Sequence, residues 1–186
     1  MEKTLRREAG RTEPRLLVLT GLFAALGCAA TMVLQVPSPT GGYLNLGDAV
    51  VILGAWLLGP VYGAVAGGVG PAMADLLSGY AMYVPATLVI KALMALTAAL
   101  LYRALGKKGL AVCAAAAEVP MVVGYWLFDA LLTALSSGAS FGLCLAGSAA
   151  GIPSNLVQAA FGAAASTLLA LALRRSAYVQ KRFPRF

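Results

Sequence analysis

Charged residues are distributed very unevenly along this chain. Residues 16–173 contain only eight charged side chains, although the whole sequence carries 14 Lys and Arg. Five basic residues precede Leu16, three lie within 103–108, five follow Leu173, and Lys91 stands alone in an apolar stretch. Long apolar segments flanked by basic residues are typical of membrane proteins, because basic residues collect on the cytoplasmic side. We therefore predict a polytopic membrane protein with both termini and the 103–108 loop in the cytoplasm, which requires an even number of spans.

Gly, Pro and polar residues divide the apolar region into six segments, which predict an all-α bundle of six transmembrane helices. Their approximate bounds are 16–36, 44–58, 61–78, 85–104, 110–135 and 150–173, and the outward-facing connections are 37–43, 79–84 and 136–149. The alternative is one bent helix across Gly59 and Pro60, but five spans would place the C-terminal basic cluster outside. We expect a single membrane domain, residues 1–186, with basic cytoplasmic tails at 1–15 and 174–186.

Composition argues against several other classes of protein. The net charge of +7 comes from basic residues placed as expected beside anionic lipid headgroups, and it does not indicate nucleic-acid binding. The chain has no His and three scattered Cys, so we expect no metal site and no cofactor. An intramembrane enzyme would need a nucleophile with a base, and no such pair is apparent. The apolar run continues past Cys28 to Val36, which favours a retained first helix over a cleaved lipoprotein signal.

Five charged residues lie inside the predicted spans, where each costs about 2.5–3.5 kcal/mol at a helix centre. Helix rise places Asp75, Lys91 and Asp129 at similar depths below the outer ends of their helices, and Asp48 opens its span at the same face. We predict that Asp75, Lys91, Asp129 and Asn155 line one polar cavity open to the outside. The alternative is a structural ion pair of Lys91 with Asp75 or Asp129. The fifth residue, Glu118, lies nearer the inner end, where we expect a hydrogen bond between helices.

Polar and small residues form stripes at helical spacing. Tyr125 lies one turn from Asp129 on the fifth span, and the sixth span aligns four such residues, Gly151, Asn155, Gln158 and Gly162. Small residues that let helices approach closely recur on the first span, at Gly21, Ala25 and Ala29, and on the third, at Gly63, Gly67, Gly70 and Ala74. Internal packing is one interpretation of either stripe, and a surface for a partner protein is the other.

Several short motifs, in this order and placement, resemble the substrate-binding S components of energy-coupling factor (ECF) transporters. They are Gly-Tyr-Leu-Asn-Leu-Gly-Asp (42–48), Leu-Leu-Gly-Pro-Val-Tyr-Gly (57–63), Ala-Asp-Leu-Leu-Ser-Gly-Tyr (74–80), Pro-Ala-Thr-Leu-Val-Ile-Lys (85–91), Gly-Tyr-Trp-Leu-Phe-Asp (124–129) and Pro-Ser-Asn-Leu-Val-Gln (153–158). The resemblance covers most of the chain. It implies a bacterial plasma-membrane protein that captures a vitamin outside the cell and is not an enzyme.

The resemblance also implies partners and roles for particular residues. A membrane coupling protein and two cytoplasmic ATPases would supply energy, and the coupling protein would dock on the groove of Gly21, Ala25 and Ala29. The loop at 37–47 would close over the substrate. The Ala-Asp-Leu and Ile-Lys motifs resemble the branch that handles pyridoxine or hydroxymethylpyrimidine. We expect the substrate to contact Asn45, Asp48, Asp75, Tyr83, Lys91, Tyr125, Trp126, Asp129, Asn155 and Gln158.

Two alternatives stay open at this stage. The chain is compatible with an S component for riboflavin or another vitamin, since members of the family exchange substrates within one fold. It is also compatible with an autonomous proton-coupled carrier that uses its buried carboxylates, although no inverted repeat is apparent. Coupling proteins purified with the chain would indicate the S component.

Overall fold

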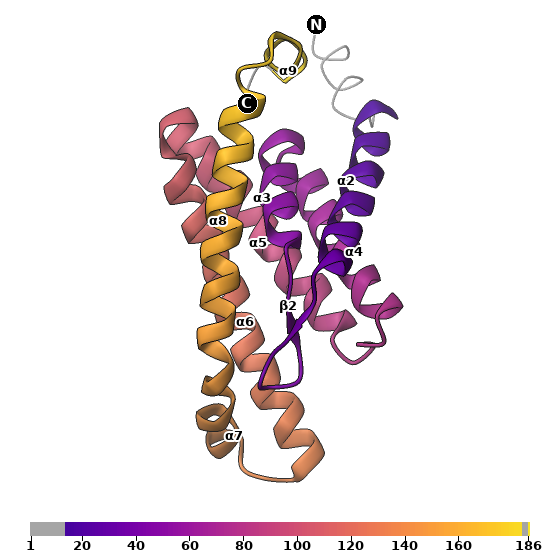
Figure 1. Cartoon of the computed structure of the whole chain (residues 1–186), viewed down its shortest axis with the longest axis vertical. Coiled ribbons are helices and arrows are strands. Elements are labelled where there is room, and N and C mark those ends of the chain that lie inside the picture. Colours follow the sequence, from indigo (N-terminus) through magenta and orange to yellow (C-terminus); the bar gives the residue numbers. More distant parts are fainter. Residues whose placement is uncertain (1–13, 184–185) are drawn as a thin grey trace, which may run out of the picture.

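Inside lipid the backbone must satisfy its own hydrogen bonds, and the chain does so by forming helices over nearly its whole length. The computed structural model describes residues 14–183 and 186 (Figure 1). Six longer helices are α2 (Pro14–Val33), α3 (Gly47–Leu58), α4 (Pro60–Leu77), α5 (Val84–Leu105), α6 (Leu110–Ser137) and α8 (Ile152–Leu173). Four short helical pieces are η1 (Gly106–Gly109), α7 (Phe141–Ser148), η2 (Ala149–Gly151) and α9 (Ala177–Arg182). The predicted all-α class is confirmed.

Three segments are long and apolar enough to cross a membrane: Pro14–Val33, Val84–Ser137 and Phe141–Leu173. The second of them contains both α5 and α6, joined by η1. Helix α3 is apolar but only 12 residues long. These lengths support a multi-pass membrane protein, and the count of six spans stays a prediction.

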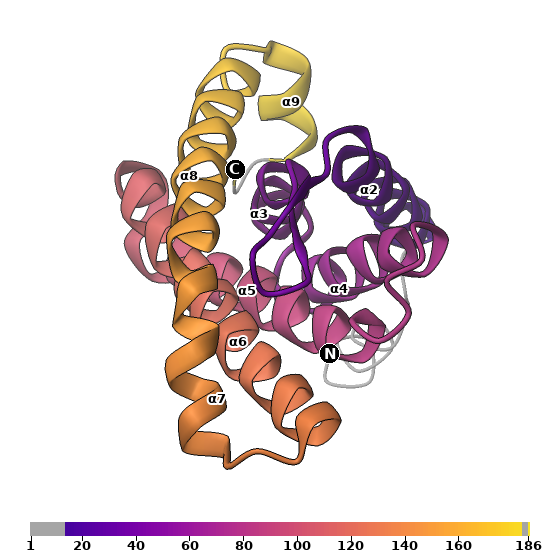
Figure 2. The same ribbon diagram turned by 60° about the horizontal axis from the view of Figure 1, so that its bottom comes forward.

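Helices α3 and α5 lie in the interior of the bundle, and α2 lies at its edge (Figure 2). Helix α4 contacts α2, α3 and α5, while α8 contacts α3 and α6. The apolar core is built mainly from α3, α5 and α6, with Ile52, Met94, Cys113 and Met121 fully buried. Helix α2 by contrast exposes large apolar side chains such as Leu22 and Leu26.

Helices α3 and α4 are separate, and the chain turns back on itself between them. Gly59 ends α3 with its N–H bonded to Ala55 O, and its φ of +82° is a conformation that glycine adopts readily. Pro60 then occupies the first turn of α4, where a missing N–H costs nothing. The alternative of one bent helix is therefore wrong.

Three segments differ from the predicted loops and tail. The 37–43 connection belongs to a small hairpin of β1 (Val36–Pro37) and β2 (Tyr43–Leu44), paired antiparallel. The 136–149 connection contains α7, whose apolar residues pack on α6 and whose Leu145 O accepts a bond from Trp126 Nε1 at 3.0 Å. The C-terminal tail contains α9. Short elements of this kind depend on contacts with distant residues, which local patterns do not report.

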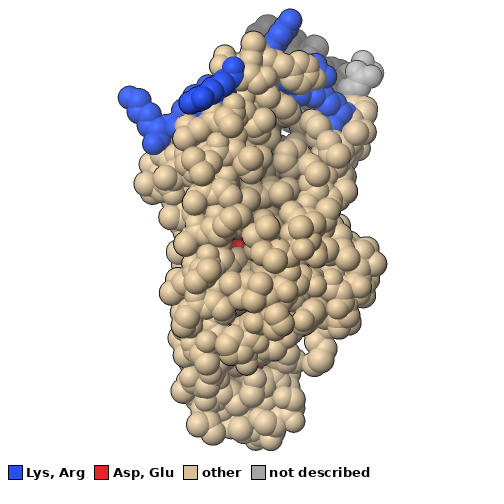
Figure 3. All heavy atoms as spheres, viewed as in Figure 1, with Lys and Arg blue, Asp and Glu red and all other residues tan. Residues whose placement is uncertain are grey.

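Basic side chains gather at one end of the molecule, whereas acidic ones are almost hidden (Figure 3). At that end Arg15 Nη2 donates to Arg182 O at 3.3 Å, which joins the start of α2 to α9. Arg174 donates to Lys107 O at 3.1 Å, which joins the end of α8 to η1. The described parts of both tails and the 103–108 loop thus share one end, and the assignment of that end to the cytoplasm stays a prediction. Most of the predicted N-terminal tail lies outside the described residues.

Glycines on α4 permit close contacts between helices. A Cβ at Gly63 would lie 2.6 Å from Ala55 Cα, and one at Gly67 would lie 2.9 Å from both Ala95 and Val51. The α4 stripe is therefore an internal packing surface. The Gly21 position on α2 differs, because a Cβ there would meet nothing within 4 Å.

We predict that Gly63→Ala destabilises the protein, because the new methyl group would push α3 and α4 apart. Overpacking of this kind typically costs about 1–3 kcal/mol. Thermal unfolding in detergent should show a lower midpoint for Gly63→Ala and an unchanged or higher one for the matched control Gly21→Ala. Equal midpoints for the two variants would contradict the close contact.

Candidate substrate-binding pocket

The β1–β2 hairpin is tied by hydrogen bonds to three helices at the end of the bundle away from the basic residues. Thr40 Oγ1 donates to Asp129 Oδ2 of α6 at 2.6 Å, and Tyr43 Oη donates to Asp75 Oδ1 of α4 at 2.6 Å. Just beyond the hairpin, Asn45 N donates to Gln158 Oε1 of α8 at 2.8 Å. Since each bond joins the hairpin to a different helix, this short segment closes over the space between them.

Tyrosine side chains surround that space. Tyr83 Oη donates to Asp129 Oδ1 at 2.9 Å, and the hydroxyl of Tyr125 lies 2.9 Å from Thr87 Oγ1. Burial raises the pKa of Tyr83, a loop residue, and the adjacent Asp129 charge raises it further. Burial likewise raises the pKa of Tyr43 in the hairpin, as does its bond to Asp75. Both phenols therefore stay protonated and act as donors to the carboxylates.

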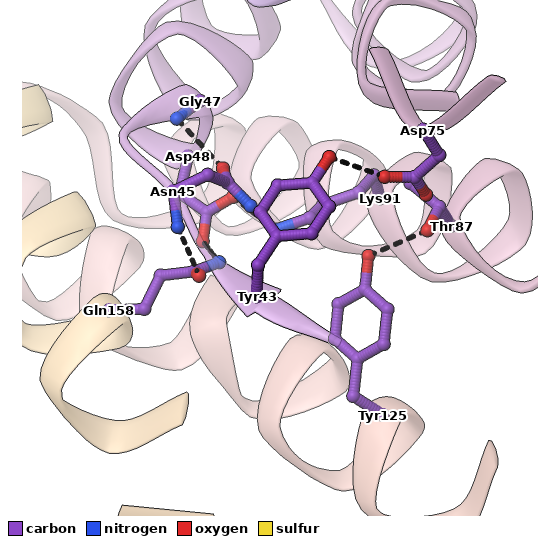
Figure 4. A network of polar contacts seen from close by, with 9 residues as sticks. All are labelled: Tyr43, Asn45, Gly47, Asp48, Asp75, Thr87, Lys91, Tyr125 and Gln158. Carbon is purple, nitrogen blue, oxygen red and sulfur yellow. Dashed lines mark hydrogen bonds and ion pairs between the residues drawn. The ribbon is translucent and has the colours of Figure 1, made fainter. Parts of the chain in front are cut away.

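Beneath the hairpin lies a buried ion pair between Lys91 of α5 and Asp48 of α3 (Figure 4). Both side chains are at most 1% exposed. The second oxygen of Asp48 accepts a bond from Gln158 Nε2 at 2.6 Å, and the ammonium lies 5.6 Å from the ring centre of Tyr125. Lys91 is thus paired with Asp48, and the pairing with Asp75 or Asp129 considered from sequence is wrong.

A small cavity of about 30 Å³ lies between the hairpin and α4, α5, α6 and α8. That volume holds about two water molecules. Its lining consists of Ser38, Gly42, Tyr43, Asn45, Asp75, Tyr83, Thr87, Tyr125, Asp129, Asn155 and Gln158. The lining contains two carboxylates and no basic residue, so the cavity favours ligands that donate hydrogen bonds.

The structure brings together seven of the ten side chains that we expected to contact substrate, namely Asn45, Asp75, Tyr83, Tyr125, Asp129, Asn155 and Gln158. The other three lie elsewhere. Asp48 and Lys91 form the ion pair behind the cavity, and Trp126 faces α7. The predicted common cavity therefore includes Asp75, Asp129 and Asn155 but not Lys91, because its ammonium is bound to Asp48.

Sequence reasoning missed three lining side chains, Ser38, Tyr43 and Thr87, and also Thr40, which does not line the cavity but bonds Asp129. Asp75 and Asp129 were identified because burying a charge among apolar helices is costly. A hydroxyl carries no charge, so the same criterion did not identify these residues. The position of Tyr43 beside Asn45 in the hairpin sequence was the available hint. Ser38 and Thr40 enter the site only because the hairpin folds back toward Ser154 and Asp129.

The small-residue stripe of α2 faces outward. Gly21, Ala25 and Ala29 are all exposed, and apolar neighbours at Leu22 and Leu26 are about half exposed. This exposure disagrees with a role in packing within the chain. The stripe thus remains available to another molecule, a lipid tail or a protein helix.

The fold and the cavity define a multi-pass membrane protein with a small polar site closed by a loop. Residues 11–175 match the family described as the ECF-type riboflavin transporter, S component. The chain therefore belongs to the ECF transporter S component family, whose members are substrate-binding subunits for vitamin uptake and not enzymes. Members associate with a T component and ATPases in a membrane complex.

A shorter similarity connects the chain to an archaeal protein. The chain is 50% identical over 62 residues to a protein of Pyrococcus woesei described as an uncharacterized protein in the gap 3′ region. The match covers 33% of this chain and 41% of that relative.

We predict that Lys91→Met destabilises the fold strongly, because it leaves Asp48 charged and unpaired in the interior. Breaking a buried pair in this way costs about 3–5 kcal/mol. The double variant Asp48→Asn/Lys91→Met should recover much of the loss, since it removes both charges. Chemical unfolding in detergent gives the free energy of unfolding of the parent, of Lys91→Met and of the double variant. The exposed Lys107→Met is the matched control. A double variant no more stable than Lys91→Met would contradict the pairing.

Proposed function

We propose that this chain captures a small, hydroxylated heteroaromatic vitamin, of the pyridoxine or hydroxymethylpyrimidine kind, in the cavity beneath the hairpin. Membership of the S component family supports vitamin uptake. The observation that carries the finer proposal is the pair of buried carboxylates, Asp75 and Asp129, whose partners in the closed pocket are the hydroxyls of Thr40, Tyr43 and Tyr83. Hydroxyl and ring N–H groups of a ligand have the same donor chemistry.

The hairpin acts as a lid in this proposal. A cavity of about 30 Å³ is far below the 300–1,000 Å³ of ordinary ligand sites, so a vitamin enters only when the hairpin moves. Opening breaks the bonds of Thr40 to Asp129 and of Tyr43 to Asp75. Both carboxylates then need new donors, which the ligand supplies. The positive φ of Gly41, +106°, supports a turn at the hairpin tip that depends on glycine.

Charge restricts the ligand further. The only basic side chain near the cavity among the described residues, Lys91, is already neutralised by Asp48. An anionic group in the cavity would face Asp75 and Asp129 without a compensating cation, and burying an unpaired charge is costly. The site therefore favours neutral or cationic vitamers over their phosphate esters. Tyr43, Tyr83 and Tyr125 offer rings against which a heteroaromatic ligand stacks.

We predict that the purified protein binds a free vitamin at least 100-fold more tightly than the matching phosphate ester, about 2.7 kcal/mol. The panel pairs pyridoxine, hydroxymethylpyrimidine and riboflavin with their phosphates, and calorimetry or native mass spectrometry measures affinity.

Asp129→Asn and Tyr125→Ala should weaken binding at least tenfold, while Leu127→Ala, a half-exposed neighbour on α6, should not. Tighter binding of riboflavin than of the other two would assign the alternative substrate. Preference for a phosphate ester would contradict the role of the carboxylates.

We also propose that the chain spans the membrane six times with the basic end in the cytoplasm, as one domain over residues 1–186. The coupling protein docks on the exposed Gly21, Ala25 and Ala29 stripe of α2. Small residues allow a partner helix to approach closely, which is the main source of helix association in lipid. The outward orientation of the stripe and the location of the pocket on α4, α5, α6 and α8 support a separation of docking from binding.

Ala25→Trp and Ala29→Trp should leave vitamin affinity in detergent unchanged within about twofold and abolish ATP-dependent uptake by the assembled complex. The indole would hold a partner helix away from α2 and remove its van der Waals contacts. Leu168→Trp, on the exposed face of α8, is the matched control and should transport normally. Loss of binding together with uptake would place the stripe within the folding core, and full uptake would place docking on another surface.

A further inference from the structure

One buried carboxyl group, that of Glu118, does not line the pocket. Glu118 of α6 is 3% exposed, and neither of its side-chain oxygens has a hydrogen-bond partner among the described residues. The hydrogen bond between helices that we expected from the sequence is thus not seen for Glu118 among the described residues. An ionised carboxylate in an apolar interior without a donor is strongly unfavourable.

The groups that act electrostatically on Glu118 are Asp48 and Lys91. Helix α8 lies against Glu118 and Asp48 at Gly162, where a Cβ would be in contact with Glu118 Oε1 and 2.8 Å from Asp48 Cβ. Helix α3 presents Asp48 as its only titratable side chain, α5 presents Lys91, and α8 has none. Two carboxyl groups thus share the neighbourhood of one ammonium, which is already bound to Asp48.

We propose that Glu118 keeps a proton in the folded protein and donates a hydrogen bond to Asp48, which makes this point of the bundle a proton-binding site. The cluster then carries one negative charge on Asp48, one positive charge on Lys91 and none on Glu118, so it is neutral. The protonated oxygen of Glu118 gains an acceptor, and the repulsion between two carboxylates disappears. Gly162 is the residue that leaves room for the two groups beside α8.

The proton site lies behind the pocket and is connected to it. Asp48 accepts from Gln158, and Gln158 accepts from the backbone N–H of Asn45, next to the hairpin (Figure 4). Glu118 is therefore a positioning residue: it acts on the pocket through Asp48 and Gln158 and does not touch the ligand. This inference does not depend on which vitamin binds.

The test is the protonation state of one identifiable side chain. The chain has four glutamates, and Glu118 is the only one outside residues 1–13. Infrared spectra of the full chain labelled with ¹³C-carboxyl glutamate should show a carboxylic-acid C=O band at neutral pH. Glu118→Gln should abolish that band, because the amide carries no carboxylic acid, and the amide still keeps a donor for Asp48.

Asp48→Asn provides a second, reciprocal readout. With Asp48 neutral, Lys91 needs an anion, so Glu118 should lose its proton and its acid band should become a carboxylate band. The labelled parent protein gives the primary result even if either variant fails to fold. The three other glutamates are common to all samples, so a difference between two spectra reports on Glu118. A parent spectrum with carboxylate signals only would overturn the proposal, as would an acid band that persists in Glu118→Gln.

Discussion

The Lys91–Asp48 ion pair is the interaction on which the interior of this bundle depends. A lysine and an aspartate in lipid-facing positions would be expensive, and the pair is tolerable only at a point where α3, α5, α6 and α8 shield it together. Its position accounts for glycine at 162, where α8 has to pass close to Asp48. It also fixes Gln158, whose amide bonds both Asp48 and the backbone at Asn45.

The pocket follows from this arrangement. Because Asp48 satisfies Lys91, the two carboxylates nearer the hairpin, Asp75 and Asp129, have no cation and depend on hydroxyl donors. Those donors come from the hairpin and from Tyr83, so the proposed opening of the hairpin would remove one donor from each carboxylate. The proposed preference for neutral or cationic hydroxylated rings follows from the pairing of Lys91 with Asp48.

In the proposed function, docking and substrate binding use different surfaces. The small-residue stripe of α2 is exposed, whereas the cavity lies between the hairpin and α4, α5, α6 and α8. Helix α4 uses the same kind of stripe for the opposite purpose, since its glycines admit Ala55, Ala95 and Val51. Identical sequence patterns thus serve internal packing on one helix and leave a free surface on another.

The sequence by itself determined the class of protein and most of the residues around the cavity. Apolar run length and the clustering of basic residues follow directly from the energetics of the bilayer, so they can be read without contacts. Burial of Asp75, Asp129 and Gln158 could be inferred in the same way, because polar residues in apolar helices have few permitted locations.

Only the tertiary structure decided which charges pair, which stripe is exposed and which hydroxyls the hairpin brings to the pocket. Helix rise gives the depth of a residue but not which neighbour it faces, so it could not distinguish Asp48 from Asp75 as the partner of Lys91. Equally, the hydroxyls of Thr40 and Tyr43 become part of the site only when the hairpin folds over α4 and α6. These outcomes depend on contacts between residues 32 to 89 positions apart, and no local pattern encodes them.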